Sequence, residues 1–385
     1  MNMNYLIPKI LVVDDEPDLE MLINQKFRKE IKDGKYNFTF AGNGIEALKK
    51  LNEDQEIELV LTDINMPEMD GLTLLAKIKE LNNPLLHSVI VSAYGDILNI
   101  RTAMNGGAFD FVVKPIDLTD LEITIKKAID NLATFKKALK SRDELMAVRK
   151  ELEEARSLQL SMLPINTPQI NELEFAVFMN TASEVGGDYY DFSFKEDGSL
   201  NIAIGDATGH GMRAGIMVAI MKALFISDSA ELDLVDFFSN SNKTIKALNL
   251  GRMMMAFTVL NIKNNQVQFV NAGMPPIFIY KKAYNTVTEF ETQCMPLGAI
   301  SDSIFKINKF DVDSGDAILI LSDGLPELKN VGEAQYGYTR VKDEFKSIAE
   351  KTPNEIVKYL KDSASQWVNG VEPDDDVTFV VIKVK

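Results

Sequence analysis

The sequence offers very little sulfur or imidazole chemistry. Its 385 residues include a single cysteine, Cys294, and two histidines, His87 and His210. One cysteine cannot form an internal disulfide or a thiolate metal cluster, and two histidines cannot build a histidine-rich metal site. Any metal bound by this chain must therefore be held by oxygen ligands.

The chain also lacks an excess of positive charge and any long apolar run. Its formal net charge is −16, which argues against broad nucleic-acid binding and against an anionic membrane surface. No run approaches the roughly 18 apolar residues of a membrane helix, and the N-terminal residues show no signal-peptide pattern. We therefore expect a cytoplasmic protein with no nucleic-acid and no membrane partner. A length of 385 residues is enough for two or three domains. The content of 46% hydrophobic and 25% charged residues is typical of a globular protein.

The N-terminal part alternates apolar runs with helical segments. Four runs are typical of buried parallel strands: residues 10–13, 59–62, 89–91 and 109–113. Four helices are predicted in the same part of the chain: residues 18–31, 44–51, 72–81 and 97–104. This alternation predicts a flavodoxin-like, doubly wound parallel sheet, in which ligands bind beyond the carboxyl ends of the strands.

Residues suited to phosphoryl chemistry come directly after these predicted strands. They are Asp14, Asp15, Asp63, Ser92 and Lys114. Carboxylates can gather a magnesium ion, a hydroxyl and an ammonium group can hold a phosphoryl group, and one carboxylate can attack phosphorus.

The motif DINMPEMDG at residues 63–71, together with Asp14-Asp15 and Lys114-Pro115, resembles the response-regulator receiver domains over about the first 120 residues. The resemblance implies that Asp63 accepts a phosphoryl group from a sensor histidine kinase. It also implies Mg²⁺ bound by Asp14, Asp15 and Asp63. The switch residues implied are Ser92, Phe111 and Lys114. The alternative is a flavodoxin-like fold that is not phosphorylated.

Residues 118–162 contain neither glycine nor proline and are rich in Lys, Glu, Arg and Leu. Apolar residues recur in alternating steps of three and four, with a slip of phase near Arg142. This pattern predicts one long helix. A solvated spacer is one interpretation, and a dimeric coiled coil that transmits a signal is the other. The sustained apolar seam favours the coiled coil, and with it a homodimer through residues 118–162.

The C-terminal part mixes strands and helices without strict alternation. The predicted strands are residues 175–179, 190–194, 201–204, 255–262, 266–271, 277–280, 305–312, 317–321 and 377–384. The predicted helices are residues 215–227, 234–248, 340–349 and 353–367. Many antiparallel strands with paired helices indicate an antiparallel β-sandwich flanked by helices.

Acidic residues adjoin several of these strands. Asp206 follows a short strand and precedes a glycine-rich turn, where a backbone without side chains can bend sharply. Further acidic segments lie at residues 184–188, at Asp323 and at residues 374–376. Acidic loops at strand ends predict a carboxylate cage for hard divalent cations.

These acidic segments look like the SpoIIE/RsbU branch of the metal-dependent serine/threonine phosphatases, the type 2C-like PPM family. The motifs are ASEVGGDYYD at 182–191, GDATGHG at 205–211, NAGMPP at 271–276, LSDG at 321–324 and DDDVT at 374–378, and the segment ARSLQLSMLP at 155–164 is similar to the helix that opens that domain. The resemblance implies that Asp206 bridges two Mn²⁺ or Mg²⁺ ions. It further implies ligands from the Ala207 carbonyl, Asp188, Asp323 and Asp375.

One metal ligand is not assigned uniquely, because three consecutive aspartates, Asp374, Asp375 and Asp376, occupy that part of the motif. The family pattern favours Asp375, and Asp376 is an additional candidate. His210 lies between two glycines, so it is either a structural residue or a proton donor, and we leave it outside the catalytic set.

The domains expected are a receiver at residues 1–120, a helical coiled-coil linker at 121–165 and a phosphatase at 166–385. Together the two resemblances imply that phosphorylation of Asp63 controls a protein-serine/threonine phosphatase. Its substrate would be a phosphorylated STAS-type anti-sigma-factor antagonist in a partner-switching pathway. The alternative is an inactive phosphatase-like adaptor that binds a sigma factor or its regulator.

Overall fold

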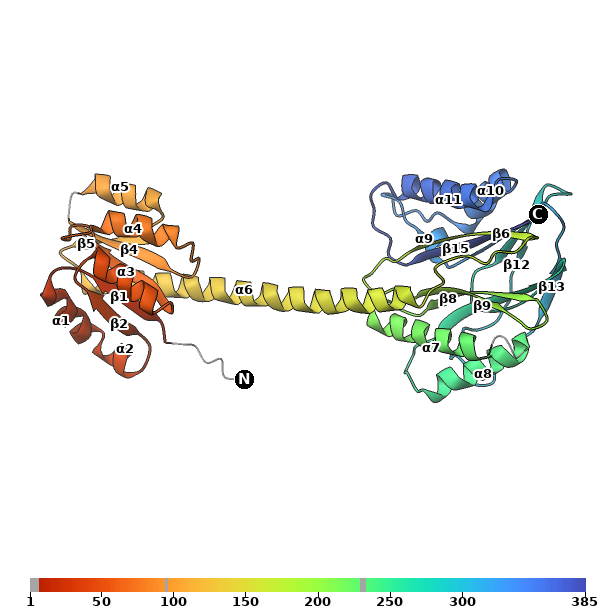
Figure 1. Cartoon of the computed structure of the whole chain (residues 1–385), viewed down its shortest axis with the longest axis horizontal. Coiled ribbons are helices and arrows are strands. Elements are labelled where there is room, and N and C mark those ends of the chain that lie inside the picture. Colours follow the sequence, from red (N-terminus) through yellow and green to blue (C-terminus); the bar gives the residue numbers. More distant parts are fainter. Residues whose placement is uncertain (1–6, 94–95, 229–232) are drawn as a thin grey trace. The chain divides into compact units, whose positions relative to one another are not determined.

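The computed structural model describes residues 7–93, 96–228 and 233–385. The chain forms two compact units, Met1–Met146 and Ala147–Lys385, which are described separately here (Figure 1). In the described part of the chain, no helix is both long enough and apolar enough to cross a membrane.

The first unit contains a five-stranded parallel sheet in the order β2-β1-β3-β4-β5. Its strands are β1 (Lys9–Val13), β2 (Asn37–Ala41), β3 (Ile57–Asp63), β4 (His87–Ala93) and β5 (Asp110–Lys114). The predicted doubly wound fold is confirmed. Strand β2 was not predicted, because its sequence NFTFA is exposed at alternate positions at the edge of the sheet and is not a continuous apolar run.

Among the described residues of this unit, five helices lie entirely within it: α1 (Pro17–Lys26), α2 (Arg28–Lys32), α3 (Gly44–Glu53), α4 (Gly71–Glu80) and α5 (Ile97–Gly106). The prediction of a single helix over 18–31 was wrong. The helix is interrupted at Phe27, whose backbone leaves the helical region (φ −94°, ψ 15°). The ring of Phe27 is fully buried against Tyr36 and Phe38, so packing in the core accompanies the break.

A long helix, α6 (Leu118–Ser161), begins in the first unit and ends in the second. Near its start, Leu121, Ile125 and Ala128 are fully buried in the core formed with β1, β3 and α1. The early part of the predicted seam therefore packs within its own unit. Farther along the helix, the apolar side chains of Leu145 and Met146 are exposed, so this later part of the seam is free to contact another chain.

The second unit contains two five-stranded antiparallel sheets. One has the order β13-β10-β9-β8-β7 and the other β12-β11-β14-β15-β6. The strands are β6 (Leu173–Asn180), β7 (Asp188–Phe194), β8 (Leu200–Ala207), β9 (Met255–Lys263), β10 (Gln266–Ala272), β11 (Ile277–Lys281), β12 (Thr286–Phe290), β13 (Asn308–Asp311), β14 (Ala317–Leu321) and β15 (Val377–Val384). The predicted β-sandwich is confirmed.

Helices cover the outer faces of both sheets. Figure 1 shows the green helices α7 and α8 against the sheet of β8 and β9, and the blue helices α10 and α11 against the sheet of β6 and β15. A third apolar cluster fills the space between the sheets. The helices of this unit are α7 (Met212–Asp228), α8 (Leu234–Ala247), α9 (Gly324–Glu327), α10 (Tyr338–Ile348) and α11 (Pro353–Val368).

Three features of this unit differ from the prediction. Strand β13 starts at Asn308, and the earlier Phe305 instead packs beneath α8 against Phe238. The short strand β12 and the single-turn helix α9 were not predicted. Neither contains an apolar run long enough to be recognised, since β12 alternates and α9 has four residues.

Candidate functional site

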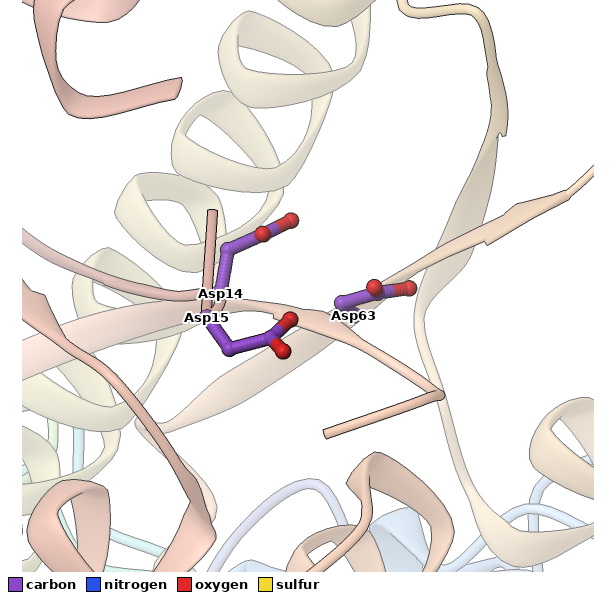
Figure 2. Close-up of side chains that lie close together, drawn as sticks. All are labelled: Asp14, Asp15 and Asp63. Carbon is purple, nitrogen blue, oxygen red and sulfur yellow. The ribbon is translucent and has the colours of Figure 1, made fainter. Parts of the chain in front are cut away.

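In the first unit, the predicted phosphoryl-chemistry residues meet at one edge of the sheet. Asp14 and Asp15 follow β1, and Asp63 ends β3. One carboxylate oxygen from each lies within 4.8 Å of the others, a geometry that can hold a metal ion. Figure 2 shows the three side chains gathered at the strand ends. Because β1 and β3 are adjacent and parallel, their carboxyl ends bring these carboxylates together.

Lys114, at the end of β5, lies beside this acidic pocket. Its Nζ donates hydrogen bonds to Asp14 Oδ2 and Asp63 Oδ2, both at 2.9 Å. Burial opposes the charged form of Lys114, but these two carboxylates outweigh the burial and raise the pKa of the ammonium group. The lysine therefore stays charged and can contact a group bound to Asp63.

The two other predicted switch residues lie in different environments. Ser92 on β4 is buried, and its hydroxyl has no hydrogen-bond partner among the described residues. Phe111 on β5 has 38% of its surface exposed. An unpaired buried hydroxyl is costly, so Ser92 is suited to bind a group that arrives at the pocket. Phe111, in contrast, is partly accessible to solvent at the surface of the unit.

Gly71 allows the loop after Asp63 to close tightly. A Cβ atom at this position would lie 2.1 Å from the backbone oxygen of Asp63. The Gly71 amide also donates to the Ile64 oxygen at 2.9 Å. The glycine of the motif is therefore required by the close approach of two backbone segments.

In the second unit, the predicted carboxylates come from strand ends of both sheets. Asp188 begins β7 and lies opposite Asp206 on β8. Asp323 follows β14, and Asp375 precedes β15 in the other sheet. The sequence alone could not show that these ends face each other.

Asp206 lies close enough to the carboxylates of the other sheet to be affected by their charges. Burial, followed by repulsion from Asp323, Asp375, Asp376 and Glu327, raises the pKa of Asp206 to about 8. The negative charges of neighbouring carboxylates repel one another, and a cation between them would relieve this repulsion. The donor set, made only of oxygen atoms, therefore fits hard divalent cations.

Asp188 is the most deeply buried of these acids. Burial and the nearby charge of Asp206 raise its pKa well above the usual range. Its Oδ2 accepts a hydrogen bond of 2.8 Å from the hydroxyl of Ser322. This serine lies between β14 and Asp323, so it links the carboxylates of the two sheets.

The three consecutive aspartates have different surroundings. Asp374 is exposed and forms an ion pair of 2.8 Å with Lys329. Asp375 is also exposed, and its Oδ1 accepts the backbone amide of Asp376 at 2.8 Å. Asp376 is buried, and its carboxylate accepts backbone amides of the loop before β7. The three aspartates, of which the family pattern favours Asp375, therefore differ in their environment.

Two residues near the site were not predicted to belong to it. Glu327, one helical turn after Asp323, raises the pKa of Asp323 in addition to the effect of burial. Gln159 on α6 is buried, and its side-chain amide forms two hydrogen bonds with the backbone of Gly186, at 2.7 and 3.1 Å. Glu327 could have been identified from the sequence, because it follows Asp323 by four residues. A buried glutamine in a charged helix gives little signal.

The carboxylates of the second unit are more widely spaced than those of the first. Across residues 7–93, 96–228 and 233–385, only Asp14, Asp15 and Asp63 place three ligand atoms within 4.8 Å of one another. Two cations about 3.5–4 Å apart need ligands that are spread over a larger volume, and such a site is not expected to form a single tight trio.

Two protein families match the chain in this order. Residues 10–126 match the response regulator receiver domain, and residues 196–385 match the family described as stage II sporulation protein E (SpoIIE).

Individual relatives resemble one part or the other. The phosphoserine phosphatase RsbU of Bacillus subtilis is 27% identical over 245 residues, which cover 62% of this chain and 71% of RsbU. The transcriptional regulatory protein ZraR of Escherichia coli is 37% identical over 120 residues, which cover 31% of this chain and 26% of ZraR. The SiaA-PP2C domain of Pseudomonas aeruginosa has the same fold as the second unit, with a TM-score of 0.56, 15% identity, and coverage of 63% of this chain and 99% of that domain.

Proposed function

Because the chain joins an N-terminal response regulator receiver domain to a C-terminal phosphatase domain of the SpoIIE/PP2C type, we propose that it is a phosphorylation-controlled protein phosphatase. A sensor histidine kinase phosphorylates Asp63 in the receiver. The phosphatase domain then hydrolyses phosphoserine or phosphothreonine in a partner protein.

The receiver pocket has the parts that phosphorylation of Asp63 requires. Asp14, Asp15 and Asp63 would hold Mg²⁺, which fits their oxygen ligands and close spacing. Lys114 already contacts Asp63 and can pair with the phosphoryl group, while the unpartnered hydroxyl of Ser92 can donate to it. If Lys114 and Ser92 move toward the phosphoryl group, the surroundings of the exposed Phe111 would change as well.

In the phosphatase domain, Asp206 would bridge two Mn²⁺ or Mg²⁺ ions. Asp188, Asp323, Asp375 and the carbonyl of Ala207 would supply the remaining protein ligands. When bound, the pair of ions lowers the pKa of a water molecule and neutralises charge on the phosphoryl group. The hydroxyl of Ser322 donates a hydrogen bond to one oxygen of Asp188 and so orients this carboxylate. No nucleophilic side chain is needed.

The substrate proposed is a phosphorylated STAS-type anti-sigma-factor antagonist in a partner-switching pathway. The similarity to the phosphoserine phosphatase RsbU over 245 residues supports this proposal. The activity itself rests most on one observation. Asp206 lies opposite Asp188 on the neighbouring strand, and burial together with repulsion from acidic residues of the other sheet raises the pKa of Asp206 to about 8, which a bound cation would relieve.

The test is hydrolysis of a phosphoserine-containing STAS-domain protein by the full chain with added Mn²⁺. Asp206→Asn should reduce the rate about 100-fold or more, because the stabilisation by metal ions is worth several kcal/mol. Asp374→Asn is the matched control, since Asp374 is exposed and pairs only with Lys329 among the described residues. A wild-type chain that binds the partner without hydrolysing it would favour the adaptor function instead.

We further propose that α6 couples the two domains and that phosphorylation activates the phosphatase. Leu121, Ile125 and Ala128 anchor the start of α6 in the receiver core, and Gln159 contacts the loop that precedes Asp188. Leu163, just after the helix, is buried in the phosphatase core, whereas the preceding Met162 is exposed.

The exposed apolar residues in the middle of α6 support a homodimer. Leu145, Met146 and Val148 have more than half of their surface exposed, at 67%, 62% and 53%. Apolar residues of this size on a helix are covered at low cost by a second helix. A dimer through this segment would allow receiver phosphorylation to alter how the two copies of α6 pack.

A further inference from the structure

We propose that Asp376 is a positioning residue, which holds the loop of residues 182–188 and thereby orients Asp188, and that it is not a metal ligand. The consequence for catalysis rests on the proposed phosphatase function. The contacts that carry the proposal come from the structure alone.

The carboxylate of Asp376 is engaged by three backbone amides of this loop. Its Oδ1 accepts from Ala182 at 2.7 Å, and its Oδ2 accepts from Gly187 at 2.5 Å and from Asp188 at 3.2 Å. Each carboxylate oxygen has two lone pairs, so Oδ2 is fully used and Oδ1 keeps one. A residue in this state has little capacity left to bind a cation.

The loop is shaped to receive this carboxylate. A Cβ atom at position 186 would lie 2.5 Å from Asp376 Oδ2 and 2.7 Å from Thr181 Cγ2. At position 187 a Cβ atom would lie 2.9 Å from the Ala207 carbonyl oxygen, which is a proposed metal ligand. The two consecutive glycines therefore let the loop close around Asp376 on one side and approach the cage on the other.

The backbone of Asp376 makes a second close approach, to the segment that carries Asp323. A Cβ atom on Gly324 would lie 1.8 Å from the Asp376 carbonyl oxygen. The next residue in the chain, Val377, starts β15, and the preceding residue is the proposed ligand Asp375. Asp376 thus contacts the segments of Asp188 and Asp323 and adjoins Asp375, so it can set the relative positions of all three.

The two preceding aspartates, Asp374 and Asp375, do not make such contacts with the loop. Asp374 and Asp375 are exposed, whereas Asp376 has 5% of its surface exposed. Asp375 accepts one backbone hydrogen bond, from the adjacent Asp376 amide, so its carboxylate remains available to a cation. The ligand is therefore Asp375, and Asp376 provides the support behind it.

Replacing Asp376 by asparagine removes this support with little change in volume. An amide side chain offers one acceptor oxygen and one donor NH₂ group. Since all three loop groups are donors, at least one of them must face the NH₂ group. The remaining hydrogen bonds also lose the strength that an ionised acceptor gives. The loop, and Asp188 with it, should become mobile.

The experiment compares full-length Asp376→Asn with Asp374→Asn, a change of the same kind two residues away. Hydrogen exchange of residues 182–188 is measured by mass spectrometry on the metal-free protein. The Mn²⁺ concentration that gives half-maximal hydrolysis of a phosphoserine protein is measured separately. We expect at least about ten-fold faster exchange in Asp376→Asn alone. We also expect an increase of about 10–100-fold in the Mn²⁺ requirement, the usual effect of removing a group that orients a ligand.

Gly186→Ala is the second variant, because its Cβ would crowd the Asp376 carboxylate, at 2.5 Å, and Thr181 Cγ2, at 2.7 Å, without changing any charge. It should speed exchange and raise the Mn²⁺ requirement in the same direction, and it decides the matter should Asp376→Asn fail to fold. Equal exchange in Asp376→Asn and Asp374→Asn would overturn the proposal. So would normal exchange combined with the loss of one bound Mn²⁺ by calorimetry, which would make Asp376 a ligand. A wild-type chain without metal-dependent hydrolysis would refute the proposed function, while the exchange comparison would still decide the role of Asp376.

Discussion

Replacing Gln159 by alanine tests whether α6 is coupled to the phosphatase site through side-chain contacts or is only a passive connection between the domains. The side-chain amide of Gln159 donates to the Gly186 carbonyl and accepts from the Gly186 amide. Both contacts are buried, and alanine removes both. The backbone of Gly186 then lacks its partners, at a position two residues from Asp188.

The size of the effect follows from these two bonds. A buried polar group left without a partner costs about 1–3 kcal/mol. Two such groups would together lower the free energy of unfolding by at most roughly 2–6 kcal/mol. Water that enters the space left by the side chain would reduce this loss. We therefore expect about 2–4 kcal/mol of lost stability. With a urea dependence of about 2–3 kcal/mol/M, the unfolding midpoint should fall by roughly 1 M.

The only tryptophan of the chain makes the measurement specific to the second unit. Trp367 lies on α11, where its ring contacts Arg340 and Tyr336, so its fluorescence reports unfolding of this unit. Leu158→Ala is the control, since Leu158 is the neighbour of Gln159 on the same helix and is 65% exposed. Its effect on stability should stay within about 0.5 kcal/mol.

The same two variants are then assayed for hydrolysis, with and without beryllofluoride as a mimic of the phosphoryl group on Asp63. Gln159→Ala should abolish the difference that the mimic makes, and Leu158→Ala should preserve it. Two results would contradict this reasoning: an unfolding midpoint equal to that of the control, or a full response to the mimic in Gln159→Ala.

The remaining predictions concern the receiver, the helix and the cage. Asp63→Asn should make the hydrolysis rate insensitive to a phosphoryl donor while leaving the basal rate within about two-fold, because Asp63 belongs to a separate unit; a response that persists would point to another phosphorylation site. Insertion of four residues after Ser141 rotates the two halves of α6 by about 40°, and it should remove the effect of beryllofluoride, so an undiminished effect would indicate a passive tether. Asp323→Asn should weaken Mn²⁺ binding less than Asp206→Asn, since it is expected to contact one ion and not two, and calorimetry that ranks them in reverse would argue against a bridging Asp206.

Most of the strands and helices could be predicted because they repeat simple patterns. The strands β1, β3, β14 and β15 are nearly continuous apolar runs, and each is buried along almost its whole length. Such runs need no knowledge of the neighbouring strands. The candidate metal ligands could also be identified from the sequence, because each adjoins one of these runs or a glycine-rich turn.

The elements that were missed depend on partners far away in the sequence. Strand β2 is recognisable only from its pairing with β1, and β12 only from its pairing with β11. The early apolar residues of α6 satisfy a coiled-coil pattern equally well, yet Leu121 and Ile125 are covered by the receiver core. A pattern of spacing shows which face of a helix is apolar, and it cannot show what covers that face.

The same distinction separates the residues that would bind metal from those that position them. Asp206 and Asp323 lie in short motifs, where a carboxylate next to a strand end is visible in the sequence. Gln159, by contrast, reaches its partner Gly186 over 27 positions, and Asp376 reaches Gly187 over 189. The loop of residues 182–188 is therefore held on one side by the helix that leaves the receiver and on the other by the strand that follows Asp375. A change in α6 that loosens the first contact would act on a loop whose second contact stays fixed, so we expect it to shift Asp188 without dismantling the proposed cage. An arrangement of this kind would permit the rate of hydrolysis to be regulated while the proposed metal ligands remain the same.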